Sequence, residues 1–281
     1  MTIAVTAASG QLGREVLQAL LRLNVGRPII GLARSPSRAA DLGVDIRPGD
    51  YSDSETLTGS LAGVDALLLI SGNGPPEERI VQHRNVIDAA RAAGVRRIVY
   101  TSIQGAEQGT AFSPVVQSNR QTEADIRSSG LNWAIGRNGI YIEPDIDYIP
   151  NYVAAGEIVN CAGNGRCGYA TRFELAHAYA RLLIDDARPG DTYNLHGDRL
   201  TQNQLASYLS QMADSQILYR AISAKDYLED RTRELGPFIG AIITGIYEGI
   251  RDGALDHPSD YEAAAGRPHQ SWDDYFQARQ P

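Results

Sequence analysis

The segment from Ala7 to Gly13 has the residue types and spacing of a phosphate-binding turn. It reads Ala7-Ala8-Ser9-Gly10-Gln11-Leu12-Gly13, follows a short β-branched run and precedes a helical pattern. Glycines let the backbone approach a pyrophosphate closely, and the N–H groups at the start of the helix then bind it. The alternative is a tight strand-to-helix turn without a ligand. If the position of Ala7 requires a positive φ, alanine costs about 1 kcal/mol there.

An arginine at the next candidate strand end indicates which dinucleotide this turn would bind. Arg34 follows the strand, with Ser35, Ser37 and Arg38 close by. A site that prefers NAD(H) carries an acidic residue near this point, whereas arginine pairs with the 2′-phosphate of NADP(H) through parallel donors. We therefore expect NADP(H) rather than NAD(H). The alternative is that Arg34 is a solvated surface side chain.

Polar residues follow three further candidate strands. Asp50 comes after the third strand, where its carboxylate either accepts from an adenine amino group or caps the helix that begins near Ser54. The fourth and fifth strands are followed by Ser71-Gly72 and Thr101-Ser102. In a doubly wound sheet the carboxyl ends of the strands line the ligand crevice, so we expect these residues beside the dinucleotide.

The elements that must position these residues alternate between strand and helix. Candidate strands lie at 2–6, 28–33, 44–47, 66–70, 97–101 and 132–137, and helical patterns separate most of them. Residues 66–70 are all apolar, as in a parallel strand that is buried on both faces. The alternation predicts an α/β fold with a doubly wound (Rossmann) parallel sheet.

After about residue 140 the alternation stops, and a smaller, mostly helical C-terminal lobe is expected. Amphipathic helices are predicted at 172–185, at 202–213 and at 225–251, the last interrupted at Gly236-Pro237. We expect residues 1–140, with further elements from about 170–200, to form the NADP(H)-binding domain. Residues 141–281 are expected mainly to form the substrate-binding lobe.

The composition excludes several classes of function. Of the 26 basic residues in this 281-residue chain, one is a lysine, Lys225, so a P-loop is excluded. The net charge of −8 argues against binding to nucleic acid. The sequence contains no run of 18 apolar residues of the kind that could span a membrane. Cys161 and Cys167 are expected to be free thiols in a reducing cytoplasm, with a local disulfide as the alternative. No Cys or His cluster has the spacing of a metal site.

Taken together, these segments resemble the NmrA-like group of atypical short-chain dehydrogenases, in particular its quinone-reducing and triphenylmethane-reducing members. The resemblance covers most of the chain and weakens after about residue 215. It implies a Rossmann domain, a cleft under the C-terminal lobe, and NADP(H) held by Ser9, Gly10, Gln11 and Leu12. The matching stretches are 9–13, 67–71, 82–87, 89–90, 92–95, 100–102, 122–123, 137–139, 170–172, 193–195 and 200–202.

The proton relay of typical short-chain dehydrogenases is missing. Those enzymes use Tyr-x-x-x-Lys, in which the lysine lowers the tyrosine pKa, and a Glu often follows four residues later. Counting back from Glu123 puts Asn119 at the lysine position, as a candidate cofactor contact, and Val115 at the tyrosine position. Lys225 has Ala221 four residues before it, so the chain contains no such motif. Tyrosine-assisted alcohol oxidation is therefore not expected.

Two functions remain. The first is hydride transfer from NADP(H) to a small conjugated acceptor such as a quinone or a cationic dye, which needs little acid catalysis from the protein. Asn138 would then form a hydrogen bond with the cofactor or the acceptor, and Tyr141 would stack on the acceptor or donate a proton. These two residues are the candidate catalytic residues. The second is a non-catalytic, NADP(H)-binding, redox-sensing regulator, because the family holds both kinds. A homodimer is compatible with either function.

Overall fold

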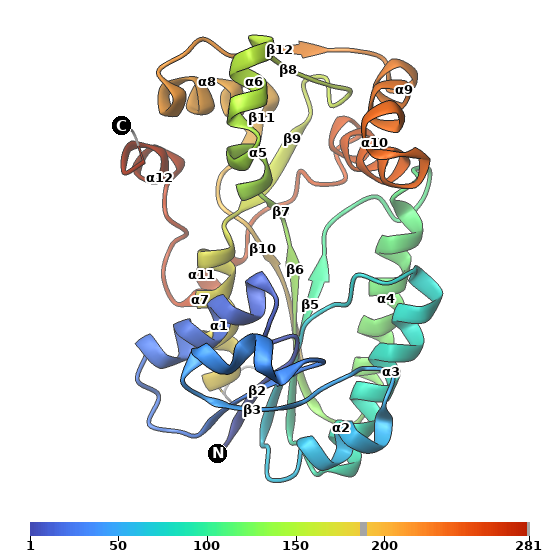
Figure 1. Ribbon diagram of the computed structural model, residues 1–281, viewed down its shortest axis with the longest axis vertical. Coiled ribbons are helices and arrows are strands. Elements are labelled where there is room, and N and C mark those ends of the chain that lie inside the picture. Colours follow the sequence, from blue (N-terminus) through green and yellow to red (C-terminus); the bar gives the residue numbers. More distant parts are fainter. Residues whose placement is uncertain (186–189, 280–281) are drawn as a thin grey trace.

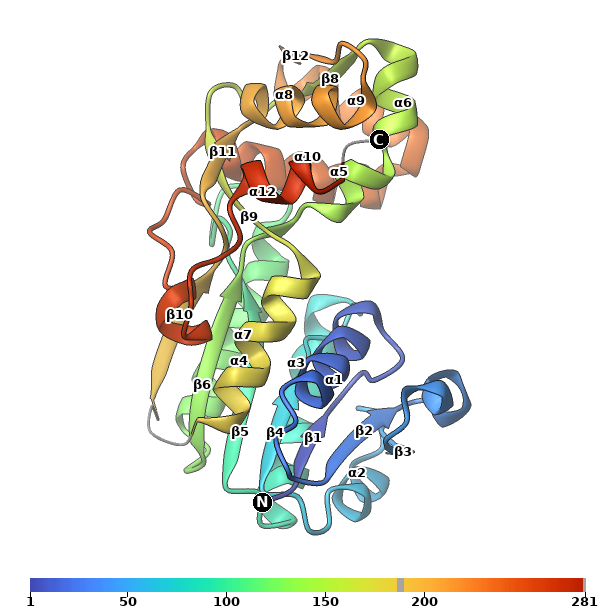
Figure 2. The ribbon, with the colours of Figure 1, turned by 90° about the vertical axis from the view of Figure 1, so that its left-hand side faces the viewer.

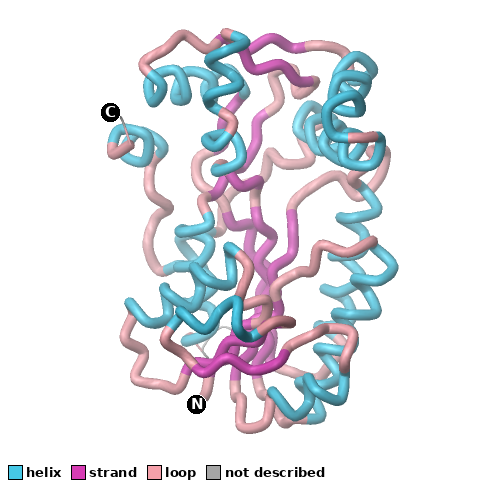
Figure 3. The backbone as a smooth tube through the Cα atoms, in the orientation of Figure 1, coloured by secondary structure: helices cyan, strands magenta, loops and turns pink. Residues whose placement is uncertain are grey.

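The computed structural model describes residues 1–185 and 190–279. Its centre is a seven-stranded parallel sheet, drawn in magenta in Figure 3 between layers of helix. The strand order reverses between β1 and β4, the switch point of a doubly wound fold. The predicted Rossmann sheet is confirmed, with a seventh strand added. Across the sheet the order is β10 (Asp191–Leu195), β6 (Asn132–Asn138), β5 (Arg97–Ile103), β4 (Ala66–Leu69), β1 (Ile3–Val5), β2 (Ile29–Ala33) and β3 (Asp45–Pro48).

Helices cover both faces of this sheet (Figure 1). One face packs against α1 (Gln11–Arg22) and α7 (Arg172–Ile184), which contribute Leu17 and Leu175 to a buried core with Val5. The other face packs against α2 (Ser54–Ser60), α3 (Pro76–Ala92) and α4 (Ser113–Arg127). Because both faces are buried, β4 consists entirely of apolar residues. The 3₁₀ helix η1 (Pro36–Leu42) follows β2.

After it has entered the C-terminal lobe, the chain adds one more strand, β10, to the main sheet. Strand β10 pairs in parallel with β6, and the register joins Tyr193 to Gly136 and Leu195 to Asn138. The preceding helix α7 buries Tyr179 beside the same strand, where its hydroxyl lies 3.0 Å from the carbonyl oxygen of Gly136. These late elements therefore support the strand end that carries Asn138.

The C-terminal lobe stands over the carboxyl ends of the strands (Figures 1 and 2). It contains helices and two small sheets, in the orders β11-β9-β7 and β12-β8. Its core includes Tyr169 and Leu205, and Cys161 and Cys167 are buried free thiols as expected. The remaining elements are β7 (Ile140–Tyr141), α5 (Glu143–Asp147), α6 (Ile149–Ala155), β8 (Glu157–Asn160), β9 (Arg166–Ala170), β11 (Arg199–Thr201), α8 (Gln202–Ala213), β12 (Leu218–Ala221), α9 (Ala224–Leu235), α10 (Pro237–Arg251), α11 (Tyr261–Ala265) and α12 (Trp272–Gln277).

The helical prediction for residues 225–251 is confirmed as two helices. Gly236 separates α9 from α10 with a φ of 83°, a conformation that glycine adopts readily, and Pro237 starts the second helix. This break turns α10 so that it packs against α9 and reaches the domain below it. Within the described residues, no helix is both long and apolar enough to cross a lipid bilayer.

Candidate functional site

The turn between β1 and α1 is shaped by close backbone packing. Ala7 has a φ of 49°, so the positive φ that its position was suspected to need is present. A Cβ on Gly13 would lie 2.3 Å from the carbonyl oxygen of Ala7, so no other side chain fits there without moving the turn. The Gly10 N–H donates to the same oxygen over 2.8 Å. Gly13 therefore allows the helix to begin directly against the turn.

The N-terminus of α1 offers free donors. Gly10 is the N-cap, no side chain caps the helix, and its first turn has no acidic residue. The N–H groups of Gln11, Leu12 and Gly13 precede the first i to i−4 bond of the helix and have no partner within it. Three N–H groups and the positive end of the helix dipole suit a pyrophosphate. This cradle fits a dinucleotide. At its rim, Ser9 is half-buried and Gly10 is exposed.

Arg34 is exposed at the end of β2 and has no hydrogen bond or ion pair with any residue in the described ranges. The neighbouring segment is fixed by Arg14, which forms an ion pair with Asp41 at 2.7 Å and also donates to the Arg38 carbonyl. The guanidinium of Arg34 is thus unpaired beside a structured loop. It is available for a phosphate at the place where a 2′-phosphate is expected.

Asp50 does not cap α2, so that alternative was wrong. The N-cap is Asp53, whose carboxylate accepts from the Thr56 N–H over 3.0 Å. Asp50 instead accepts from the Ser52 N–H over 2.9 Å and forms a local turn after β3. Its carboxylate is exposed, so the other alternative, a bond from an adenine amino group, is left.

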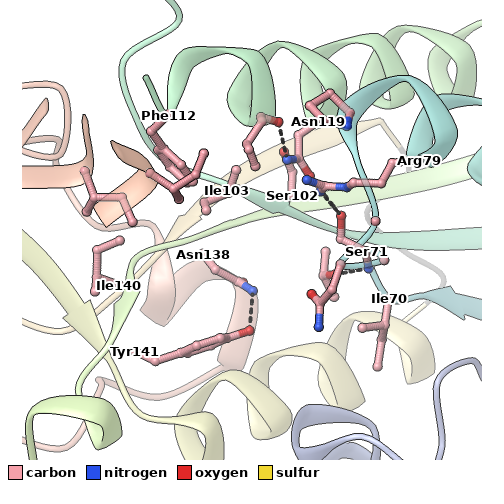
Figure 4. A pocket seen from close by; sticks show the side chains of 18 of the residues that line it. Ile70, Ser71, Arg79, Ser102, Ile103, Phe112, Asn119, Asn138, Ile140 and Tyr141 are labelled. Carbon is pink, nitrogen blue, oxygen red and sulfur yellow. Dashed lines mark hydrogen bonds between the residues drawn. The ribbon is translucent and has the colours of Figure 1, made fainter. Parts of the chain in front are cut away.

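A cavity of about 520 Å³ opens at the carboxyl ends of β4, β5 and β6 (Figure 4). It brings together half of the predicted cofactor residues, which come from four separate segments. The predicted residues that line it are Ser71, Gly72, Thr101, Ser102, Asn119, Asn138 and Tyr141. Ser9, Gly10, Gln11, Leu12, Arg34 and Asp50 do not line it and lie along the same edge of the sheet, after β1, β2 and β3.

Buried polar side chains hold the loop after β4 in place. The Gly72 N–H donates to Nε2 of His83 over 3.0 Å, so Nδ1 carries the proton and faces the Thr122 hydroxyl at 2.9 Å. Burial lowers the pKa of His83 to about 3. His83 is therefore a neutral, packed histidine that orients the loop. The backbone of Ser71 is tied to β5, because its N–H donates to Oγ1 of Thr101 over 2.8 Å.

The positions of the missing relay face this cavity. Val115 and Asn119 of α4 both line it, and Asn119 is almost completely buried. Oδ1 of Asn119 accepts from the Tyr100 hydroxyl at 2.7 Å and from the Ser71 hydroxyl at 3.0 Å. Its Nδ2 donates to the Val115 carbonyl over 2.8 Å. An amide bonded in this way contributes no charge that could activate a tyrosine.

Ser102 lines the cavity, but its hydroxyl is already used. It donates to Oε1 of Glu123 over 2.7 Å, and Glu123 also forms ion pairs with Arg120, Arg127 and Arg137. The Glu123 side chain has no exposed surface. This network joins α4 to β5 and β6, so the side chain of Ser102 supports the sheet edge. Only the backbone of Ser102 is then free to contact a cofactor.

Asn138 and Tyr141 meet across the end of β6. Oδ1 of Asn138 accepts from the Tyr179 hydroxyl, and Nδ2 points to the Tyr141 hydroxyl at 3.5 Å (Figure 4). The proton of Tyr141 has no acceptor among the described residues. Burial raises the pKa of Tyr141 despite the bond from Asn138 and the nearby charge of Arg172, whose guanidinium lies 5.0 Å from the ring centre. Tyr141 is therefore a neutral donor directed into the cavity.

Sequence reasoning missed two parts of this cavity. One is an apolar wall from α10, formed by Phe238, Ile239, Ile242 and Ile246. The other is Arg79 of α3, which is 6% exposed. Arg79 and His83 are four residues apart on the helix face that also carries the buried Val86, so an arginine on an apolar face was a detectable signal. Nothing in the local pattern of α10 indicates what it would cover.

Known proteins share this architecture. A family model described as NAD(P)H-binding matches residues 7–161. Quinone oxidoreductase 2 of Escherichia coli (strain K12) is 34% identical over 269 residues, which cover 94% of this chain and 88% of that protein. The NmrA-like family domain-containing oxidoreductase of Aspergillus flavus is 28% identical over 268 residues, covering 91% of this chain and 87% of that protein.

Two solved structures are similar over almost their full length. The Escherichia coli NADPH-dependent quinone oxidoreductase in complex with NADPH has a TM-score of 0.89 and 32% identity, and the match covers 98% of this chain and 99% of that one. The Citrobacter sp. triphenylmethane reductase in complex with NADP(H) has a TM-score of 0.89 and 33% identity, covering 99% of both chains. The chain therefore belongs to the NAD(P)H-binding, NmrA-like family.

Proposed function

We propose that this chain is an NADPH-dependent reductase that transfers hydride directly to a quinone or a similar conjugated acceptor. The observation that carries the proposal is the arrangement at the end of β6. There the hydroxyl of Tyr141 faces a largely apolar cavity, and its proton has no acceptor among the described residues. Asn138 donates to this hydroxyl, and Tyr179 in turn donates to Asn138. The similar proteins named as NADPH-dependent quinone reductase and triphenylmethane reductase support this choice of acceptor.

The cofactor would lie along the edge of the sheet from β3 to β6. The N–H groups of Gln11 and Leu12 would hold the pyrophosphate, and the unpaired Arg34 would bind the 2′-phosphate. Asp50 would accept from the adenine amino group. Once bound, NADPH supplies a hydride from its nicotinamide ring. The residues of this chain then need to orient the ring and exclude water from the cavity.

A quinone can be reduced without the Tyr-x-x-x-Lys relay that this chain lacks. A quinone that gains a hydride becomes a hydroquinone anion, which is stabilised by its ring and takes its proton from water or from a nearby donor. Tyr141 would donate a hydrogen bond to the oxygen where the negative charge develops, as a neutral phenol whose pKa is raised by burial. Val115 and Asn119 would form the wall opposite, with no lysine needed.

The test is to mix the purified protein with NADPH and a panel of quinones and to follow the absorbance of the reduced cofactor. The proposal predicts turnover with at least one quinone and a much weaker rate with NADH. Measurable NADPH binding without any turnover would overturn it and favour the second function, a redox sensor. Failure to bind either cofactor would contradict both functions and point to the turn at Ala7.

A further inference from the structure

Arg79 differs in character from every other residue of the cavity. Of the residues that line the cavity in the described chain, it is the one that carries a formal charge; most of the others are apolar, glycine or proline. Its side chain comes from the first turns of α3 and is 6% exposed.

The guanidinium of Arg79 has few partners. Nη2 donates to the Ser71 hydroxyl over 2.7 Å, and Nε is buried without any hydrogen bond (Figure 4). No carboxylate of the described residues lies within ion-pair distance. Burial lowers the pKa of Arg79, although the charge of an arginine persists in proteins. Ser71 is itself fixed by Asn119, so the guanidinium is held rather than mobile.

A second buried charge shows how unusual this is. Glu123 is buried as well, but three arginines and the Ser102 hydroxyl surround it. Removing a charge from water costs several kcal/mol unless an opposite charge compensates, so buried charges are normally paired. The residues that the structure describes supply no such compensation for Arg79. A negatively charged ligand in the cavity would supply it.

We propose that Arg79 binds an anionic group of the acceptor, so that the preferred acceptor is a conjugated ring system that carries a carboxylate, a sulfonate or an ionised ring hydroxyl. This inference rests on the proposed function and names the acceptor class more narrowly. It also means that cationic acceptors bind poorly. Arg79 thereby acts as a specificity-determining residue, while Tyr141 faces the reacting oxygen.

The phosphates of the cofactor are the other source of negative charge. The cradle for them is the N-terminus of α1 and the end of β2, whereas Arg79 lines the cavity that α10 encloses together with β4, β5 and β6. The apolar side chains of α10, such as Ile242, suit a planar ring rather than a phosphate. The position of Arg79 therefore favours the acceptor.

The test compares matched acceptors in matched variants. The pair is 1,2-naphthoquinone-4-sulfonate and neutral 1,2-naphthoquinone, and the variants are Arg79→Met and the control Arg91→Met. Arg91 lies on the same helix but is exposed and outside the cavity. The ratio of kcat/KM between the two quinones is measured for each protein, because the intrinsic reactivity of the quinones cancels when ratios are compared. Methionine removes a charge that forms no ion pair with the described residues, so the variant is expected to fold.

We expect Arg79→Met to lower the sulfonate-to-neutral ratio by about tenfold to a hundredfold, as for the loss of a charge-assisted hydrogen bond. Arg91→Met should leave the ratio unchanged. Arg79→Met should also improve the relative rate with methylene blue, a cationic acceptor. An unchanged ratio in Arg79→Met would overturn the proposal. If the variant instead weakens NADPH binding with no change in the ratio, the anion is a cofactor phosphate and the proposal is equally wrong.

A binding experiment separates this inference from the proposed function. If the wild-type protein reduces no quinone, the proposed function fails, but anthraquinone-2-sulfonate can still be titrated into the protein loaded with NADP⁺. Binding that is about tenfold weaker in Arg79→Met than in wild type and Arg91→Met would support the anionic site. Equal affinity in all three proteins would contradict it.

Discussion

The two halves of the site are built in different ways. The half at the carboxyl ends of β1 to β3 consists mainly of backbone, with Gly13 packed against Ala7 and the free N–H groups of α1. The half at the carboxyl ends of β4 to β6 consists of side chains from distant segments, including Arg79, Tyr141 and Ile242. The first half can bind the part that all dinucleotides share. The second half can differ between relatives with the same fold, and it sets which acceptor fits.

The strongest test of the backbone half is Gly13→Ala. The new Cβ would lie 2.3 Å from the Ala7 carbonyl oxygen, so the turn and the start of α1 must move apart. We expect roughly a hundredfold or greater loss of NADPH affinity in a fluorescence titration, since a displacement near 1 Å has effects of that size. Gly59→Ala in α2 is the control, because its Cβ meets no atom within 4 Å. Equal affinities in the two variants would show that the turn does not hold the cofactor.

Arg34→Ala tests a side chain that is proposed to act together with the backbone half. The exposed guanidinium has no partner in the described chain and is free for a 2′-phosphate. The variant should bind NADPH about tenfold to a hundredfold more weakly, while NADH affinity stays the same. Isothermal titration with both cofactors measures the difference. Equal losses for NADPH and NADH would mean that Arg34 does not contact the 2′-phosphate.

Tyr141→Phe tests the side-chain half. Phenylalanine keeps the ring in the cavity and removes the hydroxyl that Asn138 orients. Because water can supply the product's proton and can take the place of the lost hydroxyl, we expect kcat with a neutral quinone to fall only about threefold to tenfold. NADPH affinity should be unchanged. A fall of roughly a hundredfold or more would instead identify Tyr141 as an obligatory acid and contradict a reaction without a protein relay.

The pH profile of kcat also distinguishes a reaction without a protein relay from one in which Tyr141 is an obligatory acid. The change in kcat that we expect here is smaller. Burial raises the pKa of Tyr141 above its ordinary value of 10, so the phenol stays protonated at neutral pH. His83 stays neutral, because burial lowers its pKa to about 3. We therefore expect kcat to be level from about pH 6 to about pH 9 and to decline only at higher pH, as the phenol ionises. A bell-shaped profile centred near neutrality would reveal an acid–base pair that this account lacks.

Ala7→Gly has the smallest expected effect and tests the geometry of the turn. Ala7 has a φ of 49°, where an L side chain is strained and glycine is not. We expect urea unfolding to show a stability gain of about 0.5 to 1 kcal/mol, with NADPH affinity kept. Asn24→Gly is the control, because Asn24 has a similar φ of 46° but asparagine tolerates it better. A loss of stability in Ala7→Gly would show that the strain of this turn is negligible.

The difference between the halves also explains what could be predicted from the sequence. The alternation of strands and helices gave the Rossmann sheet, and the turn at Gly10 and Gly13 is a continuous segment that can be recognised by itself. One of the two alternatives for Asp50 was wrong, since Asp53 caps α2 and Asp50 accepts from the Ser52 N–H instead. Local spacing cannot decide between two such neighbours.

The acceptor half was predicted in part. Asn138 and Tyr141 could be named because they directly follow a strand, and strand ends meet at one edge of a sheet. Ser102 was expected at the cofactor, yet its hydroxyl bonds to Glu123, which depends on where α4 packs. The wall from α10 lies about 100 residues later in the chain than Tyr141, and it is placed by tertiary packing alone.

The central claim is that a hydride passes directly to an acceptor bound between Tyr141 and α10. The most direct measurement is single-turnover oxidation of protein-bound NADPH by an excess of 1,2-naphthoquinone, with deuterium at one or the other C4 position of the nicotinamide ring. The account predicts that deuterium slows the oxidation from one face only, in wild type and in Tyr141→Phe alike. Tight NADPH binding with no oxidation, or oxidation that is insensitive to deuterium on either face, would contradict it.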